Sequence, residues 1–192
     1  DHRAEAIAPA VAGEGVLAAA ADVVEQAPLR RAGERVRAID LAVMRAAGIG
    51  DVNLRLPKIH VVWGGDARSE PIEAALATIV RLAAEAGGVV TGKAVTLEPA
   101  LGDPETDAVI AVGGTGSGRR DAAVQTLARL GRVEVHGIAI SPGGTAAFGL
   151  IATRPVLLVP GRLDAALAVW LLIGRHLVAR LAGGRVEDWS TT

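Results

Sequence analysis

The sequence predicts an α/β fold of three layers, in which a mostly parallel sheet lies between two layers of helices. Apolar runs such as residues 59–63 and 107–112 show no polar alternation, which is typical of strands buried on both faces. Runs with helical spacing alternate with them across short connections. The 192 residues, 51% of them hydrophobic, suffice for one full core of this kind.

Composition excludes several classes of function. The net charge of −1 gives no general attraction to nucleic acid or to an acidic membrane surface, so neither is expected as a partner. The chain has no cysteine, which rules out disulfides and thiolate chemistry within it. The longest uncharged apolar run, residues 165–174, is far shorter than the roughly 20 residues of a membrane span. With no signal peptide recognised before the fold, we expect a cytoplasmic protein; residues preceding Asp1 remain open.

The first 56 residues form a small mixed region. Residues 11–36 combine short apolar pieces with glycine and proline, which indicates small strands and turns. Ile39 and Val43 then recur at helical spacing, and Gly48 is a suitable stop for a short helix. A linker over residues 50–57 follows.

Regular alternation begins after Pro57. Residues 59–63 predict a strand that ends at Gly64-Gly65. Ser69 suits the N-cap of the next helix, Pro71 suits its first turn, and the apolar face continues to Gly87. Residues 89–97 are expected to form a second strand or an extended connection.

The second half repeats the pattern. Residues 107–112 predict a strand, and a helical face carrying Val124 and Leu127 stops at Gly131. Three extended runs are then expected over residues 133–140, 146–151 and 155–159, and a long helix over residues 163–181. Because the centre of that helix is apolar all round, we expect it to be fully buried or shared with a second subunit. The second alternative is a reason to expect a homodimer.

The glycine-rich loop of residues 113–118 is the strongest chemical signal. Four glycines lie between a buried strand and a helix start, a geometry that presents backbone N–H groups to an anion. No Gly-Lys-Ser/Thr follows, so the loop is not a P-loop, and Arg119 stands where a dinucleotide fingerprint needs its third glycine. A phosphate held by N–H groups, with Arg119 and Arg120 at the helix mouth, is the functional interpretation; a tight turn with solvated arginines is the alternative.

Two carboxylates accompany this loop. Asp121 either caps the helix or holds Mg²⁺ or a ligand amine near the phosphate. Asp66 follows Gly64-Gly65 at what should be the same sheet edge, where open α/β sheets bind ligands. An Asx-turn is its structural alternative.

Other polar residues give weaker signals. Glu134 and His136 alternate on one strand, but two residues do not make a metal site, so a structural histidine is the better interpretation. The turns at residues 141–144 and 159–162 each follow a strand. One interpretation is that both turns close over a ligand at the sheet edge, with Arg162 at the start of a helix. The alternative is that they are ordinary turns.

Taken in order, these motifs resemble the molybdopterin-binding domain of molybdenum-cofactor biosynthesis proteins. The run Gly113-Gly-Thr-Gly-Ser-Gly-Arg-Arg-Asp121 is similar to the Gly-Gly-Thr-Gly-x-x-x-Arg-Asp loop of the molybdopterin adenylyltransferases. The run from His136 to Gly143, the Ala147-Phe-Gly149 strand and Pro160-Gly161 are more similar to the molybdopterin molybdotransferases of the gephyrin E-domain type. The resemblance covers about residues 11–183.

The resemblance implies a ligand and a division of the chain. The ligand is molybdopterin or its adenylylated form, with Mg²⁺ on Asp66 and molybdate as further components. Asp66 and Asp121 are the implied catalytic acids. The implied ligand-binding residues are Gly113, Gly114, Thr115, Gly116, Ser117, Gly118, Arg119, Arg120, Pro142, Gly143, Gly144, Pro160, Gly161 and Arg162.

The implied domains are a part of the elongated molybdotransferase domain with a linker in residues 1–56, the molybdopterin-binding domain in residues 57–183, and a tail in residues 184–192. The N-terminal half and the C-terminal β-barrel of molybdotransferases are expected to be absent.

The departures from the molybdotransferase pattern concern charge and hydroxyl groups. Ala67 stands where a glutamate is expected, Gly144 where a lysine is expected, and Gly116 where a serine is expected. The final turn reads Pro160-Gly-Arg-Leu-Asp-Ala165 and lacks an amide and a hydroxyl. Backbone N–H groups suffice to bind a phosphate, but molybdate insertion needs placed charges. We therefore predict a molybdotransferase-like domain with weakened catalysis. Adenylyl transfer from ATP, and a non-enzymatic carrier or oligomerisation module, are the alternatives.

Overall fold

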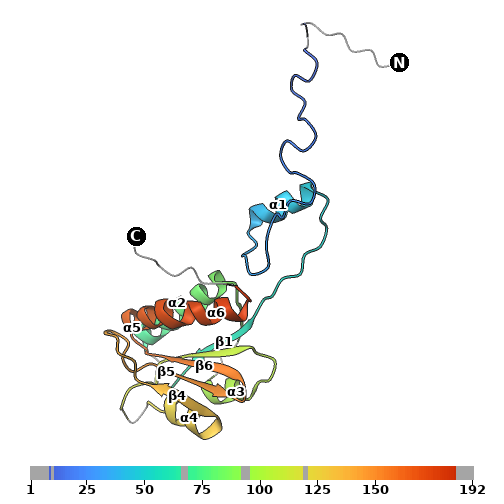
Figure 1. Ribbon diagram of the computed structural model, residues 1–192. Coiled ribbons are helices and arrows are strands. Elements are labelled where there is room, and N and C mark those ends of the chain that lie inside the picture. The colour runs from blue at the N-terminus through green and yellow to red at the C-terminus, as the bar shows by residue number, and fades with distance from the viewer. Residues whose placement is uncertain (1–8, 10, 66–68, 92–95, 119–120, 185–192) are drawn as a thin grey trace. The chain divides into compact units, whose positions relative to one another are not determined.

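A computed structural model describes residues 9, 11–65, 69–91, 96–118 and 121–184 (Figure 1). The chain divides into two compact units, Asp1–Val52 and Asn53–Thr192, and each is described by itself. The predicted Asp66, Arg119 and Arg120 lie outside the described residues.

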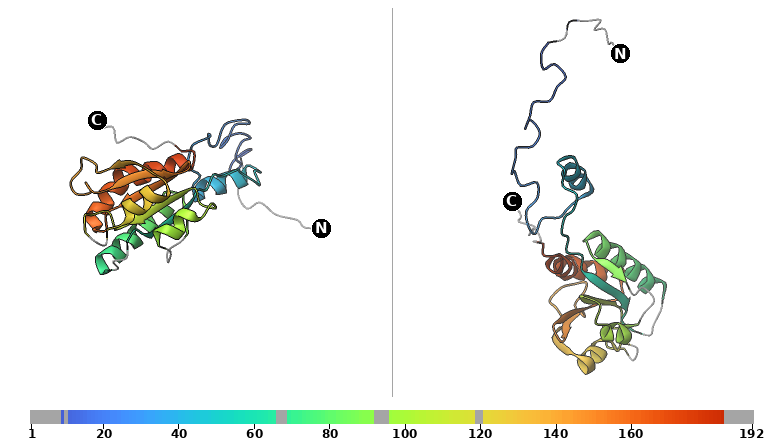
Figure 2. Two further views of the ribbon diagram at one scale, coloured as in Figure 1. Left: turned by 90° about the horizontal axis from the view of Figure 1, so that it is seen from below. Right: turned by 90° about the vertical axis from the view of Figure 1, so that its right-hand side faces the viewer.

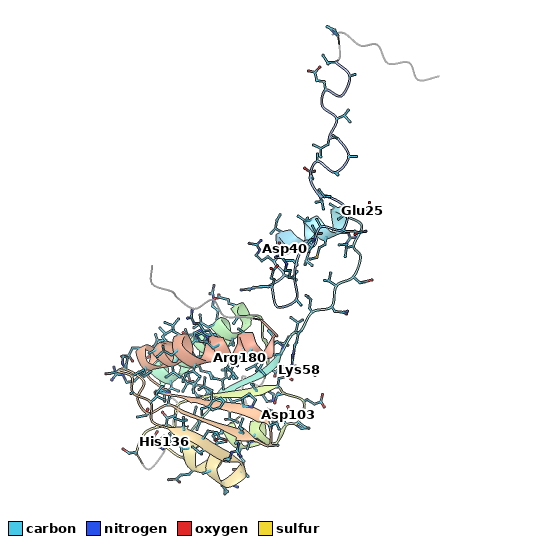
Figure 3. All side chains as sticks on the ribbon, viewed as in Figure 1. Glu25, Asp40, Lys58, Asp103, His136 and Arg180 are labelled. Atoms are coloured by element: carbon cyan, nitrogen blue, oxygen red, sulfur yellow. The ribbon has the colours of Figure 1, made fainter. Side chains whose placement is uncertain are left out.

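The first unit contains helix α1 (Ala38–Ala46), as its apolar spacing predicts. The expected small strands are not found: the described part of residues 9–36 consists of turns and irregular backbone. Asp40 is buried and joins the helix start to the preceding turns, since Arg30 Nη2 donates to its Oδ1 at 2.5 Å and Arg37 N donates to its Oδ2 at 2.8 Å. These bonds, first those from Arg30, hold the pKa of the Asp40 carboxyl well below its usual range. Figure 3 labels Asp40 in this unit.

The second unit holds the α/β fold. Its strands are β1 (Lys58–Trp63), β2 (Val89–Thr91), β3 (Ala108–Val112), β4 (Arg132–His136), β5 (Ala147–Ile151) and β6 (Arg154–Val159). Its helices are α2 (Glu70–Glu85), α3 (Leu97–Gly102), α4 (Ala123–Leu130), α5 (Leu163–Val169), the π-helical segment η1 (Trp170–Gly174) and α6 (Arg175–Leu181).

The six strands form one mixed sheet in the order β2-β1-β3-β6-β5-β4. The first four are parallel to one another, whereas β5 and β4 are antiparallel to their neighbours. The mostly parallel α/β fold predicted from the sequence is therefore confirmed.

Helices cover both faces of the sheet (Figures 1 and 2). On one face α2 and the α5–η1–α6 helix pack over Ile59, Val61 and Leu157; on the other, α3 and α4 pack over Val109 and Leu158. All five residues of β3 are buried, as its unbroken apolar run predicts. No helix among the described residues is both long enough and apolar enough to span a membrane.

The long C-terminal helix is less buried than its sequence suggests. It is continuous from α5 to α6, and the ring of Trp170 fills the space beside Gly174, where a methyl group would lie 2.4 Å from Trp170 Cε3. Trp170 is 4% exposed, but Leu171 and Leu172 are 52% and 55% exposed. Of the two alternatives, full burial within the single chain is therefore wrong, and sharing of the helix with a second subunit stays a prediction.

One further expectation needs correction. The run of residues 133–140 forms a strand only to His136, after which the backbone is irregular. Of the expected run over residues 89–97, Val89–Thr91 form β2 and α3 begins at Leu97, while residues 92–95 lie outside the described residues.

Candidate anion-binding edge of the sheet

Four turns lie along one edge of the sheet. Because β1, β3 and β6 are parallel, the turns that follow Trp63, Val112 and Val159 leave the sheet at the same edge. Strand β5 is antiparallel to β6, and its first residue Ala147 pairs with Leu158. The turn that precedes β5 therefore reaches this edge too.

Glycines allow the first two turns to touch. Gly64 N donates to Val112 O at 2.9 Å, and Gly113 N donates to Val159 O at 2.8 Å. The hydrogen bonding between the strands therefore continues into the turns. A methyl group on Gly64 would lie 2.1 Å from Gly113 O, and one on Gly114 would lie 2.7 Å from Gly64 O. A side chain at either position would separate the two turns.

The glycine loop also needs unusual backbone angles and a third close neighbour. Gly113 and Gly114 have φ values of +89° and +70°, in the left-handed region that favours glycine. A methyl group on Gly161 would lie 3.4 Å from Gly113 Cα and 3.0 Å from Ile72 Cγ1. The turns after β1, β3 and β6 thus pack into one glycine cluster.

The loop presents hydrogen-bond donors to an anion. Within the described part of the chain, the N–H groups of Thr115, Gly116 and Ser117 have no protein acceptor. Helix α4 begins at Ala123 with no side-chain cap. Helix N-termini and successive N–H groups attract anions because their partial positive charges add.

Asp121 does not cap α4, because the N-cap position is Ala122. Its carboxylate instead turns back into the loop, where Oδ2 accepts the N–H of Gly118 at 2.9 Å. A methyl group on Gly116 would lie 2.7 Å from the same oxygen. Asp121 therefore lies beside the free N–H groups, so the loop combines donors with one carboxylate acceptor.

The fourth turn is joined to the loop by a pair of hydroxyl groups. Thr115 is 4% exposed, and its Oγ1 lies 3.1 Å from Thr145 Oγ1. The turn itself contains a cis peptide bond between Ser141 and Pro142. Gly143 is buried, and a methyl group there would lie 3.1 Å from a methyl of Val169. The predicted Pro142, Gly143 and Gly144 thus belong to a turn that contacts the loop.

The remaining predicted residues differ in position. Pro160 is buried within the edge, beside Gly161. Arg162 is exposed at the start of α5, and its Nη2 lies 2.6 Å from Asp164 Oδ2. That pairing lowers the pKa of the Asp164 carboxyl. Arg162 therefore already has a carboxylate partner.

The structure does not gather a metal site from these residues. No group of three or more metal-binding side chains occurs among the residues that the structure describes. At the loop the described residues supply one carboxylate, that of Asp121. One carboxylate gives too few oxygen ligands to fit Mg²⁺ without further donors. His136 is exposed at the end of β4 (Figure 3), so it is not a buried structural histidine. Glu134 instead pairs with Arg132.

A buried polar cluster in the sheet was not predicted from the sequence. His60 of β1 is 9% exposed, with Nε2 2.7 Å from Asp103 Oδ2 and Nδ1 2.9 Å from Thr91 Oγ1. The N–H of Glu105 and the His60 ring together lower the pKa of the Asp103 carboxyl. In the sequence, the position of His60 within an otherwise apolar strand was the feature that could have indicated this cluster. These bonds tie β1, β2 and the end of α3 together.

A concavity of about 870 Å³ lies at the opposite edge of the sheet. It is bordered by Asp107, just before β3, and by Arg154 and Pro155 at the start of β6. The guanidinium of Arg154 is directed at the carbonyl oxygens of Asp103 and Leu101. The concavity is therefore separate from the glycine loop.

The sequence and fold match known proteins of cofactor biosynthesis. Residues 71–180, more than half of the chain, match the family described as "Probable molybdopterin binding domain". A protein of Methanocaldococcus jannaschii named for molybdopterin biosynthesis is 39% identical over 77 residues, which cover 40% of this chain and 19% of that protein.

Solved structures extend the likeness. A molybdopterin biosynthesis MoeA protein from Pyrococcus horikoshii is 26% identical with a TM-score of 0.60, over 81% of this chain and 43% of that one. Molybdenum cofactor biosynthesis protein B shares the fold, with 19% identity and a TM-score of 0.51 over 68% of this chain and 94% of that one. The chain thus spans about a fifth of the M. jannaschii protein and less than half of the P. horikoshii protein. It belongs to the family of molybdopterin-binding domains of molybdenum-cofactor biosynthesis.

Proposed function

We propose that this chain binds the phosphate of molybdopterin, or of its adenylylated form, at the glycine loop. The observation that carries the proposal is the row of N–H groups on Thr115, Gly116 and Ser117, which have no acceptor among the described residues and lie beside the uncapped start of α4. The loop is the part of this edge best suited to an anion.

Magnitudes support binding by backbone groups alone. A hydrogen bond to a charged group contributes about 1.5–3 kcal/mol, and a helix N-terminus contributes about 0.3–1 kcal/mol per charge. Three such bonds and the helix contribution therefore approach the roughly 8 kcal/mol of a micromolar complex, before contacts to the pterin are added.

The proposed reaction type is that of a weakened molybdotransferase, which inserts molybdate into adenylylated molybdopterin. The similarity to the P. horikoshii protein over 81% of this chain supports this type. The weakening follows from the residues at the site. Gly144 and Gly116 supply no side-chain donor, Arg162 is already paired with Asp164, and one described carboxylate, Asp121, stands in the loop. Among the described residues, transition-state charge would then be stabilised mainly by neutral groups, which lowers the rate more than the affinity.

The loop itself supports a second candidate, adenylyl transfer from ATP to molybdopterin. Residues 113–121 follow the Gly-Gly-Thr-Gly-x-x-x-Arg-Asp order throughout. In this candidate Asp66, Asp121 and Mg²⁺ would act on the ATP phosphates. A carrier without either reaction is the third candidate.

A binding experiment tests the shared part of these candidates. The probes are a stable, oxidised fluorescent pterin monophosphate derived from molybdopterin and the same pterin after phosphatase treatment. We expect micromolar binding of the phosphorylated probe and at least tenfold weaker binding of the other. Equal binding of both by folded protein would contradict phosphate recognition. Product analysis with molybdate, and separately with ATP and Mg²⁺, distinguishes the three candidates.

The homodimer and the cytoplasmic location remain predictions. Leu171 and Leu172 are both more than half exposed on the C-terminal helix, which supports a covered surface there. Light scattering at micromolar concentration is expected to give twice the mass of the chain. A monomeric mass would contradict the dimer.

A further inference from the structure

Two threonine hydroxyl groups meet beside the glycine loop. Thr115 and Thr145 are 30 residues apart in sequence, yet their Oγ1 atoms lie 3.1 Å apart. Each hydroxyl can donate one hydrogen bond and accept others. Thr115 is 4% exposed, whereas Thr145 is exposed.

Burial decides how the pair is oriented. A buried hydroxyl that does not donate loses free energy, so Thr115 donates to Thr145. No other hydrogen bond of Thr145 Oγ1 is found among the described residues. Its own hydrogen therefore remains free, one hydrogen bond away from the loop residue Thr115.

The turn that carries Thr145 lacks a cation. The described residues from 141 to 145 contain no charged side chain, and Gly144 occupies the position beside Thr145. A ligand phosphate on the N–H groups of Thr115 and Gly116 would therefore meet only neutral donors on this turn, among them the Thr145 hydroxyl.

We propose that Thr145 is a ligand-binding residue, whose hydroxyl donates to the phosphate on a turn that offers no charged side chain. This inference rests on the proposed function and adds a residue to the site. Thr115 is then the positioning residue, because its donated bond holds Thr145 at the loop.

The test compares two substitutions of Thr145 with one elsewhere. Thr145→Val removes the hydroxyl and keeps the side-chain shape, whereas Thr145→Ser keeps the hydroxyl. Thr153→Val is the matched control, since Thr153 is an exposed threonine in the turn between β5 and β6, at the opposite edge. Fluorescence titration with the phosphorylated and dephosphorylated pterins measures the dissociation constants, and circular dichroism checks folding.

We expect Thr145→Val to weaken binding of the phosphorylated pterin about tenfold, the value of one hydrogen bond to a charged group. Thr145→Ser and Thr153→Val should stay within twofold of the wild type, and no variant should change binding of the dephosphorylated pterin. A structural role would instead give equal losses for both pterins.

The outcomes separate the two proposals. If the wild type does not distinguish the two pterins, phosphate recognition itself fails. If the wild type does distinguish them and Thr145→Val binds the phosphorylated pterin as tightly, the role of Thr145 alone is overturned.

Discussion

Gly64 and Gly113 meet so closely that a single methyl group on Gly64 would lie 2.1 Å from the carbonyl oxygen of Gly113. This contact brings the turn after β1 against the turn after β3 and closes one side of the glycine loop. The hydrogen bonds Gly64 N to Val112 O and Gly113 N to Val159 O hold both turns on the sheet. The contact between these two turns thus depends on backbone rather than on side chains.

Gly64→Ala should therefore destabilise the protein by about 1–3 kcal/mol, the usual range for overpacking a filled interior. Urea unfolding of the full chain measures this change. Gly102→Ala is the matched control, because a methyl group there meets no atom within 4 Å. Equal stability of the two variants would show that the turns can separate without loss.

Gly116→Ala tests the position of the Asp121 carboxylate. The added methyl would lie 2.7 Å from Asp121 Oδ2, so the carboxylate must leave the N–H of Gly118. We expect a loss of about 1–2 kcal/mol in the wild-type background. In an Asp121→Ala background the same change should be neutral or stabilising by about 0.4–1 kcal/mol, as for an unstrained glycine replacement. A double-mutant cycle by urea unfolding measures the coupling, and additive losses would place the carboxylate elsewhere.

His60→Leu tests the buried polar cluster. The substitution removes the bonds to Asp103 and Thr91, and we expect a loss of about 1–3 kcal/mol. Pterin binding should not change, because these bonds lie within the sheet rather than at the glycine loop. His136→Leu is the control, since His136 is exposed and should tolerate the change. Similar stabilities of the two variants would contradict the account of His60.

The first unit should lose structure in acid through Asp40. The pKa of this carboxyl is lower in the folded unit than its ordinary 3.8, chiefly because Arg30 donates to it. Its contribution to stability is therefore present above about pH 4 and is lost as the pH falls further. Amide signals of residues 38–46, followed by NMR from pH 7 to pH 2, should report the loss.

In Asp40→Asn, helix α1 should already be weakened at pH 7, and the acid dependence should be flatter. Asp51→Asn, at an exposed carboxylate, is the control. Parallel acid curves for wild type and Asp40→Asn would contradict the assignment to this group.

The sequence predicts the sheet core well because its strands are buried on both faces. Strands β3 and β6 follow from unbroken apolar runs, β1 follows from an apolar run that contains His60, and α2 follows from its apolar face. Helix α3 could not be predicted in this way, since its six residues contain Pro99 and are too few for a helical period. The expected strands of residues 11–36 failed for a related reason, because short apolar pieces near glycine also fit exposed turns.

The candidate site was less predictable, because its contacts join residues far apart in sequence. Glycine positions marked the loop, but the Thr115–Thr145 bond spans 30 residues and the His60–Asp103 bond spans 43. Nothing in the local sequence indicates that Asp121 turns back to Gly118 rather than capping α4. The orientation of Asp121 depends on the conformation of the loop, which packs against Gly64 and Gly161.

The measurement that tests the central claim most directly is an NMR titration of the 19.5 kDa chain with the pterin monophosphate. We expect the largest shifts at the amide signals of Thr115, Gly116 and Ser117, and none at Ala152 and Thr153 on the opposite edge. Shifts at Ala152 and Thr153 with an unchanged glycine loop would contradict the account.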